Sequence, residues 1–286
     1  MKEDLWVKEN HLGEQMELHT PIYRIMKAEH LAADAHDRHL TLPRVIGWDD
    51  PYEGAFLRRR VSIRNTQRNT DEWVGLDGLC KDMFGLCWMR GEESDAMWRI
   101  YDPEGKHVRL ESTVNTLMRT LYHTRTQSEK EFPDRARIVL YMGGVKYLGL
   151  REFGEWMRTP ANHVVKDDSG KEIAKKMLMK RNPFAHEREV RLLYHYHENV
   201  QERSDRDSEL LSDEMSRYLV NGRAELLPRF IRLPFDWGCI KKVMIGPFGD
   251  QEAAANTLSL VKKALPDATM DVSQLYVPPP NKPAVW

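Results

Sequence analysis

A short alternating segment near the middle of the chain limits most strongly what this sequence can fold into. After Pro183, which ends the preceding helical pattern, residues 187–196 alternate as in a β-strand. One face carries Val190, Leu192, Tyr194 and Tyr196, and the other carries Glu187, Glu189, Arg191 and Leu193. Same-face neighbours are roughly 6.5–7 Å apart, so the carboxylates repel each other and Arg191 screens them. Either this charged face lies in water, or Glu187 and Glu189 point into a cleft.

Composition narrows the class of protein. The 286 residues are 41% hydrophobic, which is enough for a large core, and no apolar run is long enough to cross a bilayer. The first residues lack the pattern of a secretory signal, and Cys80, Cys87 and Cys239 have no metal-type spacing. We therefore expect a cytoplasmic protein with reduced thiols, no resident metal and no membrane partner. The net charge of −1 provides no global basic field, although nucleic acid stays open as a partner.

The order of predicted elements indicates an α+β fold. Strands are expected at 21–26, 40–42, 84–89, 107–113, 187–196, 230–235, 240–245 and 270–272, with helices at 28–39, 171–181 and 251–265 and a helix after Ser112 or Thr113. Residues 138–148 read as a hairpin that turns at Gly143 and Gly144. A β-α-β unit is expected at the C-terminus alone, which favours a mixed, mainly antiparallel sheet flanked by helices. We expect a polar lead-in at 1–19, one domain at 20–275 and a proline-rich tail at 276–286.

Two further segments carry candidate site residues. The loop at 47–54 contains Trp48, Asp50 and Glu53. Either Trp48 anchors the loop to the core, Asp50 caps the following turn and the acids lie in solvent, or these residues line a binding site. Residues 84–101 predict a buried strand and a short helix whose N-cap is Ser94, with Asp95 in its first turn. Trp88, Trp98 and Tyr101 are either core anchors or an aromatic site that stacks a ring. No P-loop, dinucleotide fingerprint, zinc-protease motif or nucleophile elbow is present.

Taken together, these segments resemble a bacterial family catalogued as domain of unknown function 2971. The resemblance covers roughly residues 20–250 and lies in five stretches: the early Ile-Tyr-Arg strand, Trp48 to Glu53, Cys87 to Tyr101, Lys180 to Arg191, and Val243 to Pro247. The family suggests no particular reaction.

A more distant similarity to the arginine–serine–glutamate class of ADP-ribosyltransferases does suggest one. It implies that Arg24 holds the phosphates of NAD, that Glu189 is the catalytic carboxylate and that Glu187 activates the acceptor. A fixed anion beside a ribose cation stabilises charge that develops only in the transition state. The resemblance further implies a cofactor site formed by Tyr23, Trp88, Ser94, Trp98 and Tyr101. The sequence departs from the class between Arg24 and Glu189, where Cys87-Trp88-Met89 replaces a Ser-Thr-Ser strand.

Two alternatives use the same residues. The acids at positions 49, 50, 53, 95, 187 and 189 would bind Mg²⁺ in a nuclease or phosphodiesterase, with Lys180 or Arg181 near the scissile phosphate. In the second alternative the cleft binds a nucleotide or a protein without catalysis. All three hypotheses predict that Trp48, Asp50, Glu53, Asp95 and Arg191 lie near the paired glutamates.

Overall fold

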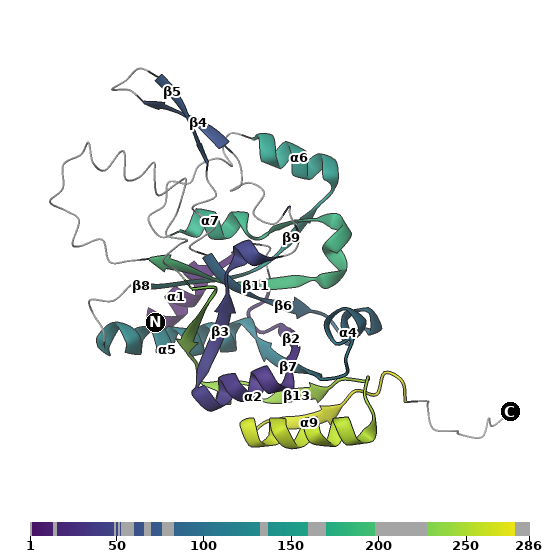
Figure 1. The fold of residues 1–286 in the computed structure, drawn as a ribbon. Helices are drawn as coiled ribbons and strands as arrows, with labels where there is room; N and C mark the ends of the chain where they lie inside the picture. Colours follow the sequence, from purple (N-terminus) through teal and green to yellow (C-terminus); the bar gives the residue numbers. More distant parts are fainter. Residues whose placement is uncertain are drawn as a thin grey trace.

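The computed structural model describes residues 2–13, 16–48, 50, 52, 60–65, 70–75, 83–131, 137–159, 170–197 and 228–277 (Figure 1). The α-helices are α1 (Lys2–Asn10), α2 (Ala28–Asp37), α4 (Asp95–Tyr101), α5 (Val114–Glu131), α6 (Leu150–Arg158), α7 (Lys171–Lys176) and α9 (Gln251–Ala264). Short 3-10 helices are η1 (Val45–Gly47), η3 (Asn182–Glu187) and η5 (Trp237–Cys239).

Within these ranges eight strands form one sheet in the order β1-β8-β11-β6-β2-β7-β13-β14. They are β1 (His11–Gly13), β2 (Pro21–Lys27), β6 (Met83–Arg90), β7 (His107–Thr113), β8 (Arg137–Gly144), β11 (Glu189–His197), β13 (Lys242–Ile245) and β14 (Thr269–Val272). The pairs β1–β8 and β13–β14 are parallel, and the other neighbours are antiparallel. The predicted α+β class, with one domain and a mainly antiparallel sheet flanked by helices, is confirmed.

The other described strands form three two-stranded ladders. β9 (Lys146–Leu148) pairs in parallel with β10 (Met179–Arg181), β3 (His39–Pro43) pairs with β12 (Phe230–Pro234), and β4 (Arg60–Asn65) pairs with β5 (Thr70–Gly75). The β9–β10 ladder brings residue 180 next to residue 147. This short ladder supplies one side of the candidate site.

Both faces of β11 are covered. Val190, Leu192 and Tyr194 belong to the larger core, which also contains residues of α2, α5 and α9. Leu193 belongs to a second core on the other face, with residues of β8 and α7. Figure 1 shows α2 and α9 side by side at one end of the sheet and α4 near the ends of β6 and β2. The charged face of β11 therefore does not lie in water, which corrects the first of the two interpretations of the alternating segment.

The predicted hairpin at 138–148 is wrong. β8 continues through both glycines and pairs with β11 and β1, whereas β9 belongs to another ladder. The glycines allow β1 to lie close to β8, because a Cβ at Gly143 would lie 2.1 Å from the carbonyl oxygen of Leu12.

The path into the central strand also differs from the prediction. The expected helix at 171–181 ends at Lys176, and residues 179–181 form β10. Glu187 is the last residue of η3, Arg188 has φ 45°, and β11 begins at Glu189. The two glutamates are therefore not successive same-face residues of one strand, because a left-handed residue turns the chain between them.

Some predictions concern the chain ends or residues outside the described ranges. Residues 2–13, predicted as part of a polar lead-in, form α1 and the edge strand β1, and Val7 is buried. Glu53, residues 198–227 and the tail from 278 lie outside the described residues, so the domain bounds 20–275 stay a prediction.

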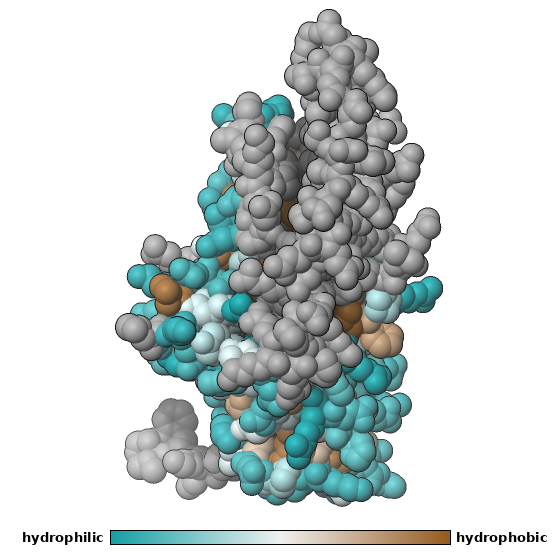
Figure 2. Space-filling view, turned by 90° about the vertical axis from the view of Figure 1, so that its left-hand side faces the viewer, coloured by the Kyte–Doolittle hydropathy of each residue, from teal (hydrophilic) through white to brown (hydrophobic). Residues whose placement is uncertain are grey.

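In the described part of the chain no helix has the length and hydrophobicity to span a bilayer. On the face shown in Figure 2, hydrophilic residues cover most of the described surface.

Candidate functional site

A buried network of four charged side chains lies where β10, η3 and β11 meet. Lys180 Nζ lies 2.5 Å from Glu187 Oε2 and 2.8 Å from Glu189 Oε1. Arg191 Nη2 lies 2.5 Å from Glu189 Oε2, and its Nη1 donates to the carbonyl of Met177. Arg191 is 0% exposed. Two cations and two acids therefore share one buried site, in which Glu189 contacts both cations and Glu187 contacts Lys180.

Local structure explains how these side chains meet. In β10, Lys180 is buried between partly exposed neighbours, as the alternation of a strand requires. Its register partner Tyr147 accepts a hydrogen bond of 2.7 Å from the backbone N–H of Glu189. The guanidinium of Arg191 stacks 4.5 Å from the ring of Trp48. The β9–β10 ladder thus holds the start of β11 in place.

The electrostatic environment separates the two glutamates. Burial raises the pKa of Glu187 to about 7, and the hydrogen bond with Glu189 adds to this effect against the attraction of Lys180. Burial alone would also raise the pKa of Glu189, but the Arg191 charge, with Glu187 and Lys180, lowers it well below its ordinary value. Burial, with the nearby glutamates, raises the pKa of Tyr101. Near neutral pH, Glu189 is therefore an anion while Glu187 is poised to gain or lose a proton.

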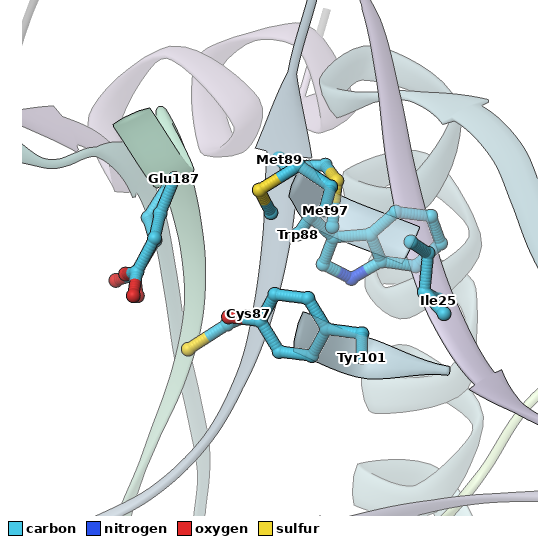
Figure 3. Close-up of a pocket in the computed structure, with 8 residues that line it drawn as sticks. Ile25, Cys87, Trp88, Met89, Met97, Tyr101 and Glu187 are labelled. Atoms are coloured by element: carbon cyan, nitrogen blue, oxygen red, sulfur yellow. The ribbon is translucent and has the colours of Figure 1, made fainter. Parts of the chain in front are cut away.

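A cavity of about 30 Å³ lies against this network. Its lining residues are Ile25, Cys87, Trp88, Met89, Met97, Tyr101, Glu187 and Glu189. In Figure 3, Glu187 lies at one side of the hollow, Trp88 and Ile25 lie at the other, and the ring of Tyr101 lies between them. Trp88 Nε1 is buried and has no hydrogen-bond partner among the described residues. The space holds about two water molecules, so a ring-sized ligand requires the flexible Met89 and Met97 side chains to move.

Three predicted residues on and beside α4 do not reach the cavity. Trp98 is 1% exposed and donates through Nε1 to Glu93 Oε1 at 2.7 Å, so it is a core anchor. Ser94 occupies the predicted N-cap position, but its side chain makes no capping hydrogen bond. Asp95 lies in the first turn as predicted and pairs with Arg99 on the surface.

The loop before residue 53 contacts the network from its outer side. Trp48 stacks on Arg191, as described above, and Asp50 Oδ1 lies 3.1 Å from Arg181 Nη2. Asp50, Asp95 and the glutamate pair thus each face a different cation. Among the described residues no group of three or more acids, histidines or cysteines has the arrangement of a metal site. The convergence that the Mg²⁺ alternative requires is not observed in this part of the chain.

The strand register separates Arg24 from Glu189. Glu189 and Tyr23 are both register partners of Met89, so these three residues share one face of the sheet. Arg24 follows Tyr23 and points to the other face, where its Nε and Nη1 are buried without hydrogen-bond partners among the described residues. Burial lowers the pKa of Arg24, against attraction by Cys87 and Asp34. Tyr23 lies on the glutamate face, but the guanidinium of Arg109 stacks on its ring at 3.5 Å.

Several residues of the site are not indicated by the sequence patterns. Only the Mg²⁺ alternative includes Lys180, and no pattern indicates Tyr147. Ile25, Cys87, Met89 and Met97 line the cavity without having been named as candidates. The spacing of Met97 and Tyr101 was the available signal, because residues i and i+4 lie on one side of a helix. No local pattern predicted Lys180, since its position depends on the β9–β10 ladder.

Comparisons with known proteins add matches among solved structures, three of which are described here. No family model matches the chain, and a search of curated proteins finds no match. Among solved structures, DarT of Thermus sp. 2.9 in complex with ADP-ribosylated ssDNA has 11% identity and a TM-score of 0.33, covering 92% of this chain and 98% of that one. The complex of the same protein with NAD⁺ has 12% identity and a TM-score of 0.32, covering 91% and 98%.

The third match, DarT in complex with carba-NAD⁺, has 12% identity and a TM-score of 0.30, covering 90% of this chain and 95% of that one. Similarity at these TM-scores does not identify a reaction. The resemblance to domain of unknown function 2971 stays a prediction.

Proposed function

We propose that the protein is an NAD-using enzyme of the ADP-ribosyltransferase kind, in which Glu187 exchanges a proton and Glu189 is a fixed anion. The observation that supports this proposal is a pair of acids with unequal proton affinity beside a cavity that Trp88 and Tyr101 line. Environments that drive the pKa values of neighbouring acids apart are a common basis for dividing catalytic roles.

In the proposed reaction the acceptor replaces nicotinamide on the ribose of NAD. The bond between ribose C1′ and the pyridinium nitrogen of NAD breaks, its electron pair goes to the nitrogen, and neutral nicotinamide leaves. The positive charge that develops on the ribose is stabilised by Glu189, which Lys180 and Arg191 keep ionised. The acceptor atom bonds to C1′ as the nicotinamide leaves and, in the same step, gives its proton to the Glu187 carboxylate. The ring of Tyr101 would contact the nicotinamide, whereas Trp88, the register partner of Val190, belongs to the larger core.

The proposal differs from what the resemblance implies at Arg24 and at residues on and beside α4. It assigns no phosphate contact to Arg24, because the register turns that side chain to the face opposite Glu189. It also leaves Trp98, Ser94 and Asp95 out of the reacting site, because none of them lines the cavity and Trp98 and Asp95 have partners elsewhere. The acceptor is not part of the proposal.

Glu187→Gln tests the proposal. Gln keeps the shape of the protonated acid but accepts no proton, so we expect NAD-dependent transfer to fall by about 10²–10⁴-fold. Release of nicotinamide from NAD, separated by chromatography, measures bond cleavage without knowledge of the acceptor. Glu155→Gln is the matched control, because Glu155 pairs with Arg151 at the surface of α6.

A binding measurement complements the kinetics. We expect NAD to raise the melting temperature of the wild-type protein, and the shift to persist in EDTA because no metal takes part in the proposed step. A wild-type protein that neither binds NAD nor releases nicotinamide would contradict the proposed function. Activity that survives Glu187→Gln unchanged would contradict the role of Glu187 alone.

A further inference from the structure

We propose that Lys180 is a positioning residue that divides the roles of the two glutamates, a step that rests on the proposed function. Its ammonium group lies between Glu187 Oε2 and Glu189 Oε1, at 2.5 Å and 2.8 Å. The three side chains are only 5%, 11% and 5% exposed, so water screens these interactions weakly. No other described cation has a recorded ion pair with both acids.

The network is asymmetric around Lys180. Glu189 contacts Lys180 through one oxygen and Arg191 through the other, so it keeps a cation if Lys180 is neutralised. Lys180 is the only cation in an ion pair with Glu187 among the described residues. Loss of the Lys180 charge should therefore act mainly on Glu187, which would face the Glu189 anion without compensation.

The position of Lys180 is determined by backbone pairing. β10 runs parallel to β9, and Lys180 lies opposite Tyr147, whose hydroxyl binds the backbone of Glu189. The Lys180 ammonium also lies 4.7 Å from the centre of the Phe184 ring. The ammonium group is thus held from β10 and η3 before any ligand binds.

Other groups near Glu187 cannot replace this charge. Tyr101 comes from α4, Cys87 from β6 and Tyr147 from β9, and none of these is a cation. Among the described residues, the titratable groups that line the cavity with Glu187 or interact with it electrostatically are Lys180, Glu189, Tyr101, Tyr147 and Cys87. The other cation of the network, Arg191, forms its ion pair with Glu189.

Carboxyl NMR titration of the full chain tests the role of Lys180 without requiring activity. The Glu187 resonance is assigned by its loss in Glu187→Gln. In Lys180→Gln, which keeps a donor but removes the charge, we expect the Glu187 midpoint to rise by about one pH unit or more, a roughly tenfold gain in proton affinity. Lys180→Arg should restore a midpoint close to that of the wild type. Lys175→Gln, a surface lysine paired with a glutamate, should leave the midpoint unchanged.

The pH profile of nicotinamide release gives the second readout. Glu187 acts as a base, so its protonation in Lys180→Gln should move the acidic limb of kcat/KM to higher pH. An unchanged Glu187 midpoint in a folded Lys180→Gln variant would overturn the role of Lys180, as would unfolding of this variant. If the wild type does not act on NAD while the midpoint still moves, the proposed function fails and the electrostatic role of Lys180 stands.

Discussion

Glu189 lies between two buried cations, which gives this residue a structural role beside its proposed catalytic one. Both of its carboxylate oxygens are occupied, by Lys180 and by Arg191. Sequence reasoning alone would expect Glu189→Gln to remove activity with little loss of stability. The buried network changes that expectation, because the substitution leaves two cations with one remaining acid.

We expect Glu189→Gln to lower the free energy of unfolding by about 3–5 kcal/mol, as breaking a buried ion pair commonly does. Urea unfolding followed by circular dichroism measures the change. The control is Glu155→Gln, which breaks a surface pair with Arg151 and should cost about 0–1 kcal/mol. Equal effects of the two substitutions would show that the buried network does not stabilise the fold.

At the scale of elements, the most informative feature is the close approach of β1 and β8. The sequence predicts a turn at Gly143 and Gly144. In the structure both glycines lie inside β8, because β1 pairs with them in parallel. A pair of glycines is compatible with a tight turn and with close strand packing, so the local pattern does not distinguish the two. The long-range partner His11–Gly13 decides between them.

Gly143→Ala tests this packing. The added Cβ would meet the Leu12 carbonyl at 2.1 Å, so we expect β1 to be displaced and the unfolding free energy to fall by about 1–3 kcal/mol. Gly149→Ala is the matched control, because a Cβ there meets nothing within 4 Å. Thermal melting and amide exchange of β1 measure the difference, and equal stability of both variants would contradict the assigned role of Gly143.

The helix α4 shows which part of an element a pattern predicts. The start of this helix after Ser94 is correctly predicted. Only Met97 and Tyr101 reach the cavity, while Trp98 turns toward Glu93. Ser273 also hydrogen-bonds to Glu93, so a residue far along the chain completes the surroundings of Trp98. Local spacing predicts that a helix forms and cannot predict which neighbours it meets.

At the scale of the whole molecule, the glutamate pair should affect stability in two pH windows. The raised pKa of Glu187 means that the folded state binds its proton more tightly than the unfolded state. Its contribution is full below its ordinary pKa of 4.5 and declines as pH rises toward about 7. The lowered pKa of Glu189 acts in the opposite sense, so its contribution is lost as pH falls below 4.5.

We therefore expect the stability of the wild type relative to Glu187→Gln to fall between about pH 4.5 and 7. Urea unfolding at a series of pH values measures this difference, because Gln does not titrate. The stability of the wild type relative to Glu155→Gln, which alters a surface pair, should show no comparable trend in this window. A wild-type stability that rises relative to Glu187→Gln from pH 4.5 to 7 would contradict the raised pKa.

Local patterns are sufficient to predict the α+β class, most strand and helix positions, the β-α-β unit at the C-terminus and the candidate residues Glu187, Glu189 and Tyr101. Alternation, helical spacing and turn residues are properties of neighbouring residues, so they can be read along the chain. Three features depend instead on packing: Lys180 joins the glutamates, Trp98 does not, and Arg24 faces away from them. Strand register and the left-handed residue Arg188 set those directions, and they depend on pairing between distant segments.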